Sequence, residues 1–345
     1  MSAGTAPQPL AGAPVRLPGW VRRHPGYVLV GACLALGFLS LALPSAPTYD
    51  PWSWILWGRE VLHGDLVTSS GPSWKPLPML FTVPFGLFGD AAPYLWVAVA
   101  RAGALLGLAL AVRLAWRLSG GGVTGILGGL VAAGGLFISS YFLRTVALGN
   151  SEGMMIAAVL AGFDRHLSGR RDQALLCGLA AALLRPEVWL FVGAYSLYAL
   201  IVERRLWKLI VGMWTVTFAL WFLPELWGSG TLLRSADRAA TPNPNSPAFA
   251  AHPWLALLQK WRPVLVFPMK VGIVAALLVA IVAFVRRRAE TATLALAAFV
   301  IAWVALIAVM TERGFSGNPR YLMPATAMAC VLAGVGWAWI LRALD

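Results

Sequence analysis

The sequence predicts an all-α, polytopic membrane protein, folded as a helical bundle with about ten transmembrane helices. Of its 345 residues, 59% are hydrophobic and only 12% are charged, whereas soluble domains carry about 25% charged residues. Apolar runs recur from Tyr27 to Leu341, and runs of roughly 20 residues are long enough to cross a bilayer. A membrane β-barrel would instead show short segments of alternating hydrophobicity.

The domain organisation follows from the order of these runs. Residues 1–24 are expected to form a disordered cytoplasmic tail, and residues 25–345 a single transmembrane domain. Two long outer loops are expected at 47–90 and 228–262, because both are polar and rich in breakers. The expected membrane helices cover residues 27–46, 93–118, 123–142, 151–167, 173–184, 188–202, 206–227, 264–285, 291–310 and 321–341.

The distribution of basic residues predicts the orientation. With a cytoplasmic N-terminus, the inner loops and tails hold fifteen Lys or Arg against five acidic residues, and the outer side holds eleven against nine. Basic residues concentrate in this way on the cytoplasmic side of membrane proteins. The net charge of +13 is therefore interpreted as a topology signal and not as a nucleic-acid surface. We expect a bacterial cytoplasmic (inner) membrane protein with both termini in the cytoplasm.

Cysteine and histidine give no sign of a disulfide framework or a metal site. Cys33, Cys177 and Cys330 all lie in apolar segments, as small core residues do. The four histidines are scattered without metal-ligand spacing. No cofactor is implied, and a divalent metal has no support in the sequence.

The chemistry is expected on the outer side, beginning with Asp50. This carboxylate directly follows the first apolar run, so it lies at membrane level and could accept a proton as a general base. A helix cap or turn residue is the structural alternative, since Asp-Pro favours turns. Lys75, between Trp74 and Pro76, is interpreted as a contact for a lipid-linked phosphate or as a snorkelling lysine.

Further ionisable residues follow along the outer side. Glu152 opens a predicted helix, where it can act as a cap or pair with Arg144, and Arg144 is alternatively a phosphate ligand. Arg185 and Glu187 interrupt an apolar run, where ionisable residues are costly and are paired or functional. The remaining candidates for binding substrate or phosphate are Arg313, Arg320 and Tyr321, just before the last helix.

Most of the seventeen tryptophans lie at segment ends, as in the aromatic belts of membrane proteins. The cluster Trp52, Trp54, Trp57 and Trp74 fits that belt best, and stacking on a sugar or lining a lipid groove is the alternative. Trp52 and Trp74 are the two candidates for sugar or lipid stacking.

The ordered set of motifs resembles the GT-C superfamily of integral membrane glycosyltransferases, such as the protein O-mannosyl and aminoarabinose transferases. The set comprises Tyr49-Asp50, Trp74-Lys75-Pro76-Leu77-Pro78, Asn150-Ser151-Glu152, Arg185-Pro186-Glu187 and Arg320-Tyr321-Leu322. The chain departs from the family in having Pro51 where many members carry a second acid. Its richness in Ala, Gly, Arg and Trp is typical of a high-GC bacterium, which indicates a short, actinobacterial-type member.

The resemblance implies transfer of a sugar from a polyprenyl-phosphate donor to an extracytoplasmic glycan, lipid or protein acceptor, with inversion. Asp50 would be the base, and Lys75, Arg144, Arg185 and Arg320 would hold the leaving phosphate. Two alternatives remain open at this point: a transporter or lipid flippase, and a non-catalytic membrane partner with the same fold. A transporter is expected to show paired broken helices, and only one break, at Arg185-Pro186, is visible.

Overall fold

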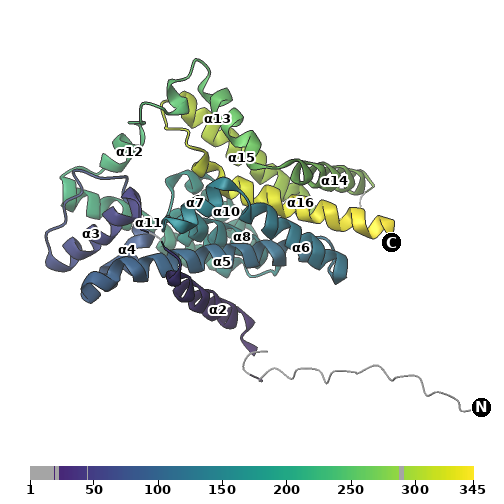
Figure 1. Cartoon of the computed structure of the whole chain (residues 1–345), viewed down its shortest axis with the longest axis horizontal. Coiled ribbons are helices and arrows are strands. Elements are labelled where there is room, and N and C mark those ends of the chain that lie inside the picture. The colour runs from purple at the N-terminus through teal and green to yellow at the C-terminus, as the bar shows by residue number, and fades with distance from the viewer. Residues whose placement is uncertain (1–18, 20–22, 45, 287–290) are drawn as a thin grey trace, which may run out of the picture.

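The computed structural model describes residues 19, 23–44, 46–286 and 291–345, and these residues form helices and connecting loops without a strand (Figure 1). The all-α fold is therefore confirmed. The predicted disordered tail lies almost entirely outside the described residues. The α-helices are α2 Pro25–Leu39, α3 Tyr49–His63, α4 Pro76–Phe85, α5 Ala92–Leu118, α6 Gly122–Phe137, α7 Ser140–Ala147, α8 Glu152–Leu167, α9 Arg171–Ala182, α10 Trp189–Val202, α11 Trp207–Ser229, α12 Arg234–Ala239, α13 Pro253–Trp261, α14 Phe267–Val285, α15 Thr291–Glu312 and α16 Met323–Leu344.

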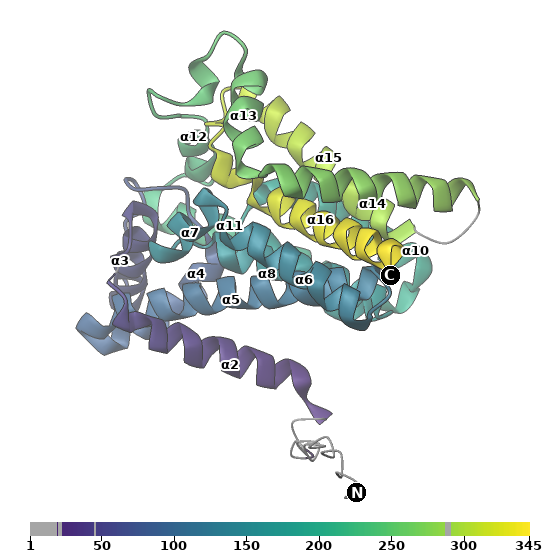
Figure 2. The ribbon, with the colours of Figure 1, turned by 45° about the vertical axis from the view of Figure 1, so that its right-hand side comes forward.

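The last helix, α16, lies at the centre of the bundle and packs against α6, α14, α15 and α5 (Figure 2). Small residues allow these close approaches, as is common between membrane helices. A Cβ atom on Gly334 would collide with the carbonyl oxygen of Gly128 in α6, and one on Gly336 with that of Gly272 in α14. The glycines of α16 thus set the spacing of the core.

Each of the ten predicted membrane segments appears as a helix, with ends within a few residues of the expected ones except where a segment is divided. Among the described residues, six helical segments are long and apolar enough to cross a membrane, or seven if α6 and α7, which are bent by 68°, form one span. Helices α8, α9 and α10 are shorter. The chain is a multi-pass membrane protein, and the count of ten crossings stays a prediction.

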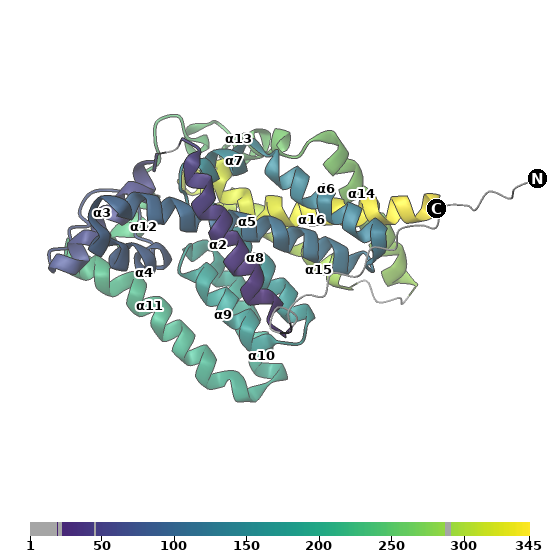
Figure 3. The same ribbon diagram turned by 60° about the horizontal axis from the view of Figure 1, so that its bottom comes forward.

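The two long connections contain helices that the sequence analysis did not predict. Residues 47–90 form α3, α4 and the 3-10 helix η2 (Gly86–Ala91), and α12 and α13 lie within residues 228–262. Helix α3 forms because it has an apolar face: Trp54, Ile55 and Trp57 are buried, and Trp54 packs edge-on against Trp96 of α5. Helix α2 crosses α5 on another side of the bundle (Figure 3).

Candidate active site

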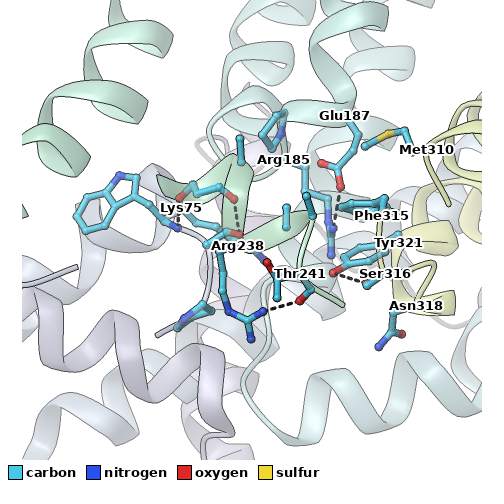
Figure 4. Close-up of a pocket in the computed structure, with 18 of the residues that line it drawn as sticks. Lys75, Arg185, Glu187, Arg238, Thr241, Met310, Phe315, Ser316, Asn318 and Tyr321 are labelled. Atoms are coloured by element: carbon cyan, nitrogen blue, oxygen red, sulfur yellow. Dashed lines mark hydrogen bonds and ion pairs between the residues drawn. The ribbon is translucent and has the colours of Figure 1, made fainter. Parts of the chain in front are cut away.

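A pocket of about 750 Å³ opens at the end of the bundle where α3, α12 and the 3-10 helix η7 (Pro319–Leu322) meet. Five cationic side chains and two carboxylates line it, together with a wall of apolar residues. Figure 4 shows Lys75 and Arg238 toward one side of the pocket, and Arg185, Glu187 and Tyr321 toward the other. The lining cations are Lys75, Arg185, Arg238, Arg313 and Arg320, and the carboxylates are Asp50 and Glu187.

Asp50 lies in the first turn of α3 and faces the pocket beside Arg320. The Nη2 atom of Arg320 is 2.9 Å from Oδ2 of Asp50, and the Asp50 side chain is 13% exposed. Burial raises the pKa of the Asp50 carboxyl, but the charges of Arg320, Lys75 and Arg185 outweigh this effect and hold the pKa below its usual range. Asp50 is therefore ionised at neutral pH, as a general base must be.

Arg320 reaches this position because η7 begins with a side-chain cap. The Oδ1 atom of Asn318 accepts a hydrogen bond from the backbone N–H of Arg320, and Pro319 follows the cap at the first helical position. Helix α16 starts directly after η7. The cation beside Asp50 is thus attached to the most deeply buried helix of the bundle.

Glu152, at the start of α8, forms the second carboxylate position, just below the pocket surface. Its Oε1 is 2.9 Å from Nη2 of Arg185 and 4.0 Å from Nε of Arg320, and its side chain is 2% exposed. Arg185 also lies 3.4 Å from Glu187. The four salt bridges form one continuous chain in the order Asp50, Arg320, Glu152, Arg185 and Glu187.

Tyr321 packs against both guanidinium groups of this chain. The Cζ atom of Arg185 lies 4.5 Å from the centre of the ring, and that of Arg320 lies 5.4 Å from it. The tyrosine hydroxyl accepts a hydrogen bond from Ser316 at 3.3 Å. A ring held in this way stabilises both cations by cation–π contact and limits their rotation.

Lys75 is a buried cation that forms no salt bridge with the described carboxylates. Its side chain is 8% exposed, its Nζ donates to the hydroxyl of Ser151 at 3.3 Å, and it lies 4.9 Å from the ring of Trp54. Within the described ranges, no carboxylate lies within 4.0 Å of this amine. Burial, and then the charge of Arg185, lower the pKa of Lys75 to about 8. The snorkelling interpretation does not fit this burial.

The structure does not bring every predicted residue together. Arg144 is exposed on α7 and does not line the pocket, and Glu152 pairs with Arg185 instead of Arg144. Arg313 lines the pocket. Arg238, on α12, was missed, although it lines the pocket and donates to the Thr241 carbonyl at 2.8 Å. Its signal was the pair of arginines, 234 and 238, in the second outer loop.

The tryptophan cluster divides into core and surface residues. Trp54, Trp57 and Trp74 are buried, which corrects their interpretation as an interface belt; the apolar face of α3 packs them inward. Trp74 borders the pocket, and its Nε1 donates to the carbonyl of Leu220 at 2.9 Å. Trp52 is exposed and does not line the pocket. The stacking role of Trp52 and Trp74 stays a prediction.

No group of three or more His, Cys, Asp or Glu side chains is placed to hold a metal ion in the part of the chain that the structure describes. The three carboxylates near the pocket are engaged with arginines, at 2.9 Å for Asp50 and Glu152 and at 3.4 Å for Glu187. The arrangement is thus one of fixed cations around an ionised carboxylate, Asp50.

These observations define the class of protein: a helical membrane protein with a cation-lined pocket at one end of the bundle. No protein-family model matches the chain, and no curated protein matches its sequence. Among solved structures, ArnT from Cupriavidus metallidurans in the apo state matches with a TM-score of 0.60 at 18% identity, over 92% of this chain and 59% of ArnT.

A second crystal structure, of ArnT from Cupriavidus metallidurans bound to undecaprenyl phosphate, matches with a TM-score of 0.55 at 17% identity. This match covers 92% of the present chain and 60% of that chain. The protein therefore spans about three fifths of the length of these ArnT chains, and it shares their fold over that part.

Proposed function

We propose that the protein is a membrane glycosyltransferase that moves a sugar from a polyprenyl-phosphate donor to an acceptor hydroxyl. The observation that carries the proposal is the Asp50 carboxylate facing a pocket whose other charged walls are mostly cations. A base and an anion-binding surface are the two elements that displacement of a phosphate from a sugar requires. The ArnT structure solved with undecaprenyl phosphate supports a lipid of this kind in the same fold.

In the proposed step, Asp50 takes the proton of the acceptor hydroxyl as that oxygen attacks the anomeric carbon. The bond between this carbon and the phosphate oxygen breaks, and polyprenyl phosphate leaves with the bonding electrons. One displacement inverts the anomeric configuration and needs a single base, so Pro51 in place of a second acid is compatible with the reaction. The lack of a second acid next to Asp50 is therefore no argument for a non-catalytic partner.

Lys75, Arg185 and Arg320 are the proposed ligands of the leaving phosphate, with Arg313 as a fourth cation on the pocket lining. Cations fixed by packing stabilise developing negative charge without having to reorient. Arg185 and Arg320 are fixed by Glu152 and Tyr321, whereas Lys75 forms no salt bridge in the described ranges and donates only to Ser151. Glu152, Glu187 and Tyr321 are thus proposed to orient the arginines.

Arg320 has to serve both partners in this proposal. In the structure it is paired with Asp50 at 2.9 Å. A donor phosphate would compete with Asp50 for the same guanidinium, because a guanidinium binds a phosphate and a carboxylate through the same donors. Donor binding would then loosen Asp50 and leave its carboxylate available for the acceptor, which favours donor binding before acceptor binding.

The apolar wall suits a prenyl chain. It includes Trp189, Leu190, Phe222, Leu233, Leu306 and Met310, next to the cations. We further propose that this end of the bundle faces the outside of a bacterial cytoplasmic membrane. Asp164, at the other end of α8, pairs with Arg113, Arg117 and Arg165, and such basic clusters are typical of cytoplasmic ends.

The test is a transfer assay with full-length protein in nanodiscs. Lipid extracts of a deletion strain identify the polyprenyl-phosphate sugar that accumulates, and this lipid is then supplied as donor with glycan acceptors from the same strain. We expect sugar transfer by the wild type and a loss of roughly 10²–10⁴-fold in Asp50→Asn, the range for removal of a general base.

Asp65→Asn is the matched control, because Asp65 is exposed near the end of the same α3 segment and does not line the pocket. Full transfer by Asp50→Asn would overturn the mechanism. Lipid flux across vesicles without sugar transfer would favour the transporter interpretation. If the protein shows neither flux nor transfer, the interpretation as a non-catalytic membrane partner remains.

A further inference from the structure

A second polar cluster, which reaches the pocket lining at Ser235, has no part in the proposed chemistry. Glu225, near the end of α11, is fully buried, with 0% exposure. Its Oε1 accepts a hydrogen bond from the hydroxyl of Ser235 at 2.6 Å, its Oε2 from Thr68 at 3.5 Å, and Arg234 lies 3.7 Å away. A buried carboxylate is costly unless it is paired and hydrogen-bonded, so this cluster calls for an explanation.

Ser235 connects this carboxylate to the backbone just before Lys75. The Ser235 hydroxyl accepts a hydrogen bond from the backbone N–H of Trp74 at 2.6 Å while it donates to Glu225. The Ser235 carbonyl accepts from the hydroxyl of Ser73 at 3.0 Å. Arg234 donates to the carbonyls of Pro72 and Gly71 at 2.5 and 2.9 Å. Residues 71–74 are thus fixed along their length by two residues of α12.

The backbone at Lys75 is held on its other side as well. Pro76 restricts the preceding residue to extended conformations, and Lys75 has φ −142° and ψ 113°. The backbone N–H of Leu77 donates to the carbonyl of Leu183 at 3.0 Å. The Lys75 side chain extends from this backbone to Ser151, directly before α8. The hydrogen bond from Trp74 to Ser235 is the anchor nearest to Lys75 on the N-terminal side.

We propose that Ser235, held by the buried carboxylate of Glu225, is a positioning residue that places the Lys75 ammonium for the lipid phosphate. The inference rests on the proposed function for the identity of the ligand. Ser235 acts through the backbone of Trp74 and needs no contact with the phosphate. Removal of its hydroxyl leaves the N–H of Trp74 without a partner, and the 71–75 segment then shifts to find one. The ammonium moves with that segment.

The first experiment is a double-mutant cycle on binding of undecaprenyl phosphate, measured by native mass spectrometry of the full chain. We expect Lys75→Met to weaken binding by about tenfold, in the range of a lost charge-assisted contact, and Ser235→Ala by about three- to tenfold. If Ser235 acts through Lys75, the double variant binds no more weakly than Lys75→Met alone. Independent, multiplicative losses would overturn the inference.

Ser229→Ala is the matched control, because Ser229 also bonds near Glu225, donating to its carbonyl at 2.8 Å, but does not touch residues 71–75. It is expected to bind like the wild type. Ser235→Thr retains the hydroxyl and should restore binding, which separates positioning from general damage to the fold.

The second experiment needs no lipid. A water-soluble acylating reagent modifies exposed amines, and peptide mass spectrometry measures the modified fraction of Lys75 against that of the exposed Lys260. Ser235→Ala and Glu225→Ala should raise the modified fraction of Lys75 several-fold, and Ser229→Ala should not. Unchanged modification would overturn the positioning role. If the variants show this change in modification but the wild type binds no polyprenyl phosphate, the proposed ligand is refuted and the positioning role stands.

Discussion

The Nη2 atom of Arg320 lies 2.9 Å from the carboxylate of Asp50, so the proposed base is paired with a cation that the proposed donor also requires. Asp50 belongs to α3, within the first long connection, and Arg320 to η7, at the entrance to the last helix. This pairing makes donor affinity and base strength depend on the same guanidinium, and the first two predictions separate these effects.

Asp50→Asn is expected to bind undecaprenyl phosphate at least as tightly as the wild type, although transfer is lost. The substitution removes the carboxylate that competes with phosphate for Arg320. Titration of the lipid in nanodiscs, with Asp65→Asn as the control, measures the change in Kd. Weaker binding in Asp50→Asn than in Asp65→Asn would show that Asp50 does not compete with the phosphate.

Arg320→Met is expected to shift the acid limb of the pH–rate profile to higher pH. The charge of Arg320 is the largest of the effects that lower the pKa of Asp50, and without it the effect of burial, which raises that pKa, is less opposed. Because the base acts as a carboxylate, the rate of the variant falls off at a higher pH than that of the wild type. The measurement is kcat/KM between pH 4 and pH 9, with roughly 10²-fold lower activity expected overall; an unshifted limb contradicts the assignment of Asp50.

Donor binding is expected to weaken as the pH rises through about 8, where the Lys75 amine loses its proton. Burial and the charge of Arg185 lower this pKa, and only the protonated amine attracts the phosphate. Lys75→Arg keeps its charge at all relevant pH values and should bind with a flatter dependence on pH. Equal pH dependence in the two proteins would exclude titration of Lys75 as its cause.

Arg238 and Arg144 allow a comparison between a cation that the structure places in the pocket lining and one that the sequence predicts to bind phosphate. Arg238 lines the pocket, whereas Arg144 is exposed on α7, away from the lining. Arg238→Gln is expected to raise the KM of a substrate by about three- to tenfold, as for loss of a charge-assisted contact, and Arg144→Gln to change it by less than about twofold, like other surface substitutions. The reverse order would support the phosphate role that the sequence predicts for Arg144.

Gly336→Ala is expected to destabilise the bundle. The added Cβ would collide with the Gly272 carbonyl on α14, and overpacking of this kind costs about 1–3 kcal/mol. Gly212→Ala in α11 is the control, because no atom lies within 4 Å of the position of its Cβ. The midpoint of thermal unfolding, followed by size-exclusion chromatography of detergent extracts, should fall for Gly336→Ala only.

The bounds of the membrane helices could be predicted from the sequence because apolar length is a local property. Helix α5 begins at Ala92 against an expected 93, and the break between α9 and α10 falls at Arg185-Pro186, as predicted. The helices inside the outer loops were not predicted. Helix α3 is stabilised by burial of tryptophans against α5, a tertiary contact that the periodicity of its own short segment does not reveal.

In the site, too, local features could be predicted from the sequence and tertiary contacts could not. Asp50, Lys75, Glu152, Arg185 and Arg320 were predicted from their places between or at the ends of apolar segments on the expected outer side. The structure joins four of them by salt bridges and places Lys75 in the same pocket lining. Their partners were not predictable, because the choice between Arg144 and Arg185 for Glu152 depends on the rotation of α8. Glu225 was missed because one of its partners, Thr68, is distant in sequence. Arg238 was missed because most of the pocket lining comes from segments distant from α12 in sequence.

The two residues of the Asp50–Arg320 pair belong to elements that differ greatly in burial. Arg320 precedes α16, in which residues 323–336 are all buried. Asp50 belongs to a short helix at the edge of the bundle that contacts mainly α4, α5 and η2. A shift of α3 would therefore change the distance between Asp50 and Arg320 while α16 stays in place, and it would be opposed by the buried Trp54 and Trp57 of α3. A molecule that binds to α3 and shifts this helix, whether acceptor or neighbouring protein, would therefore change the pKa of Asp50.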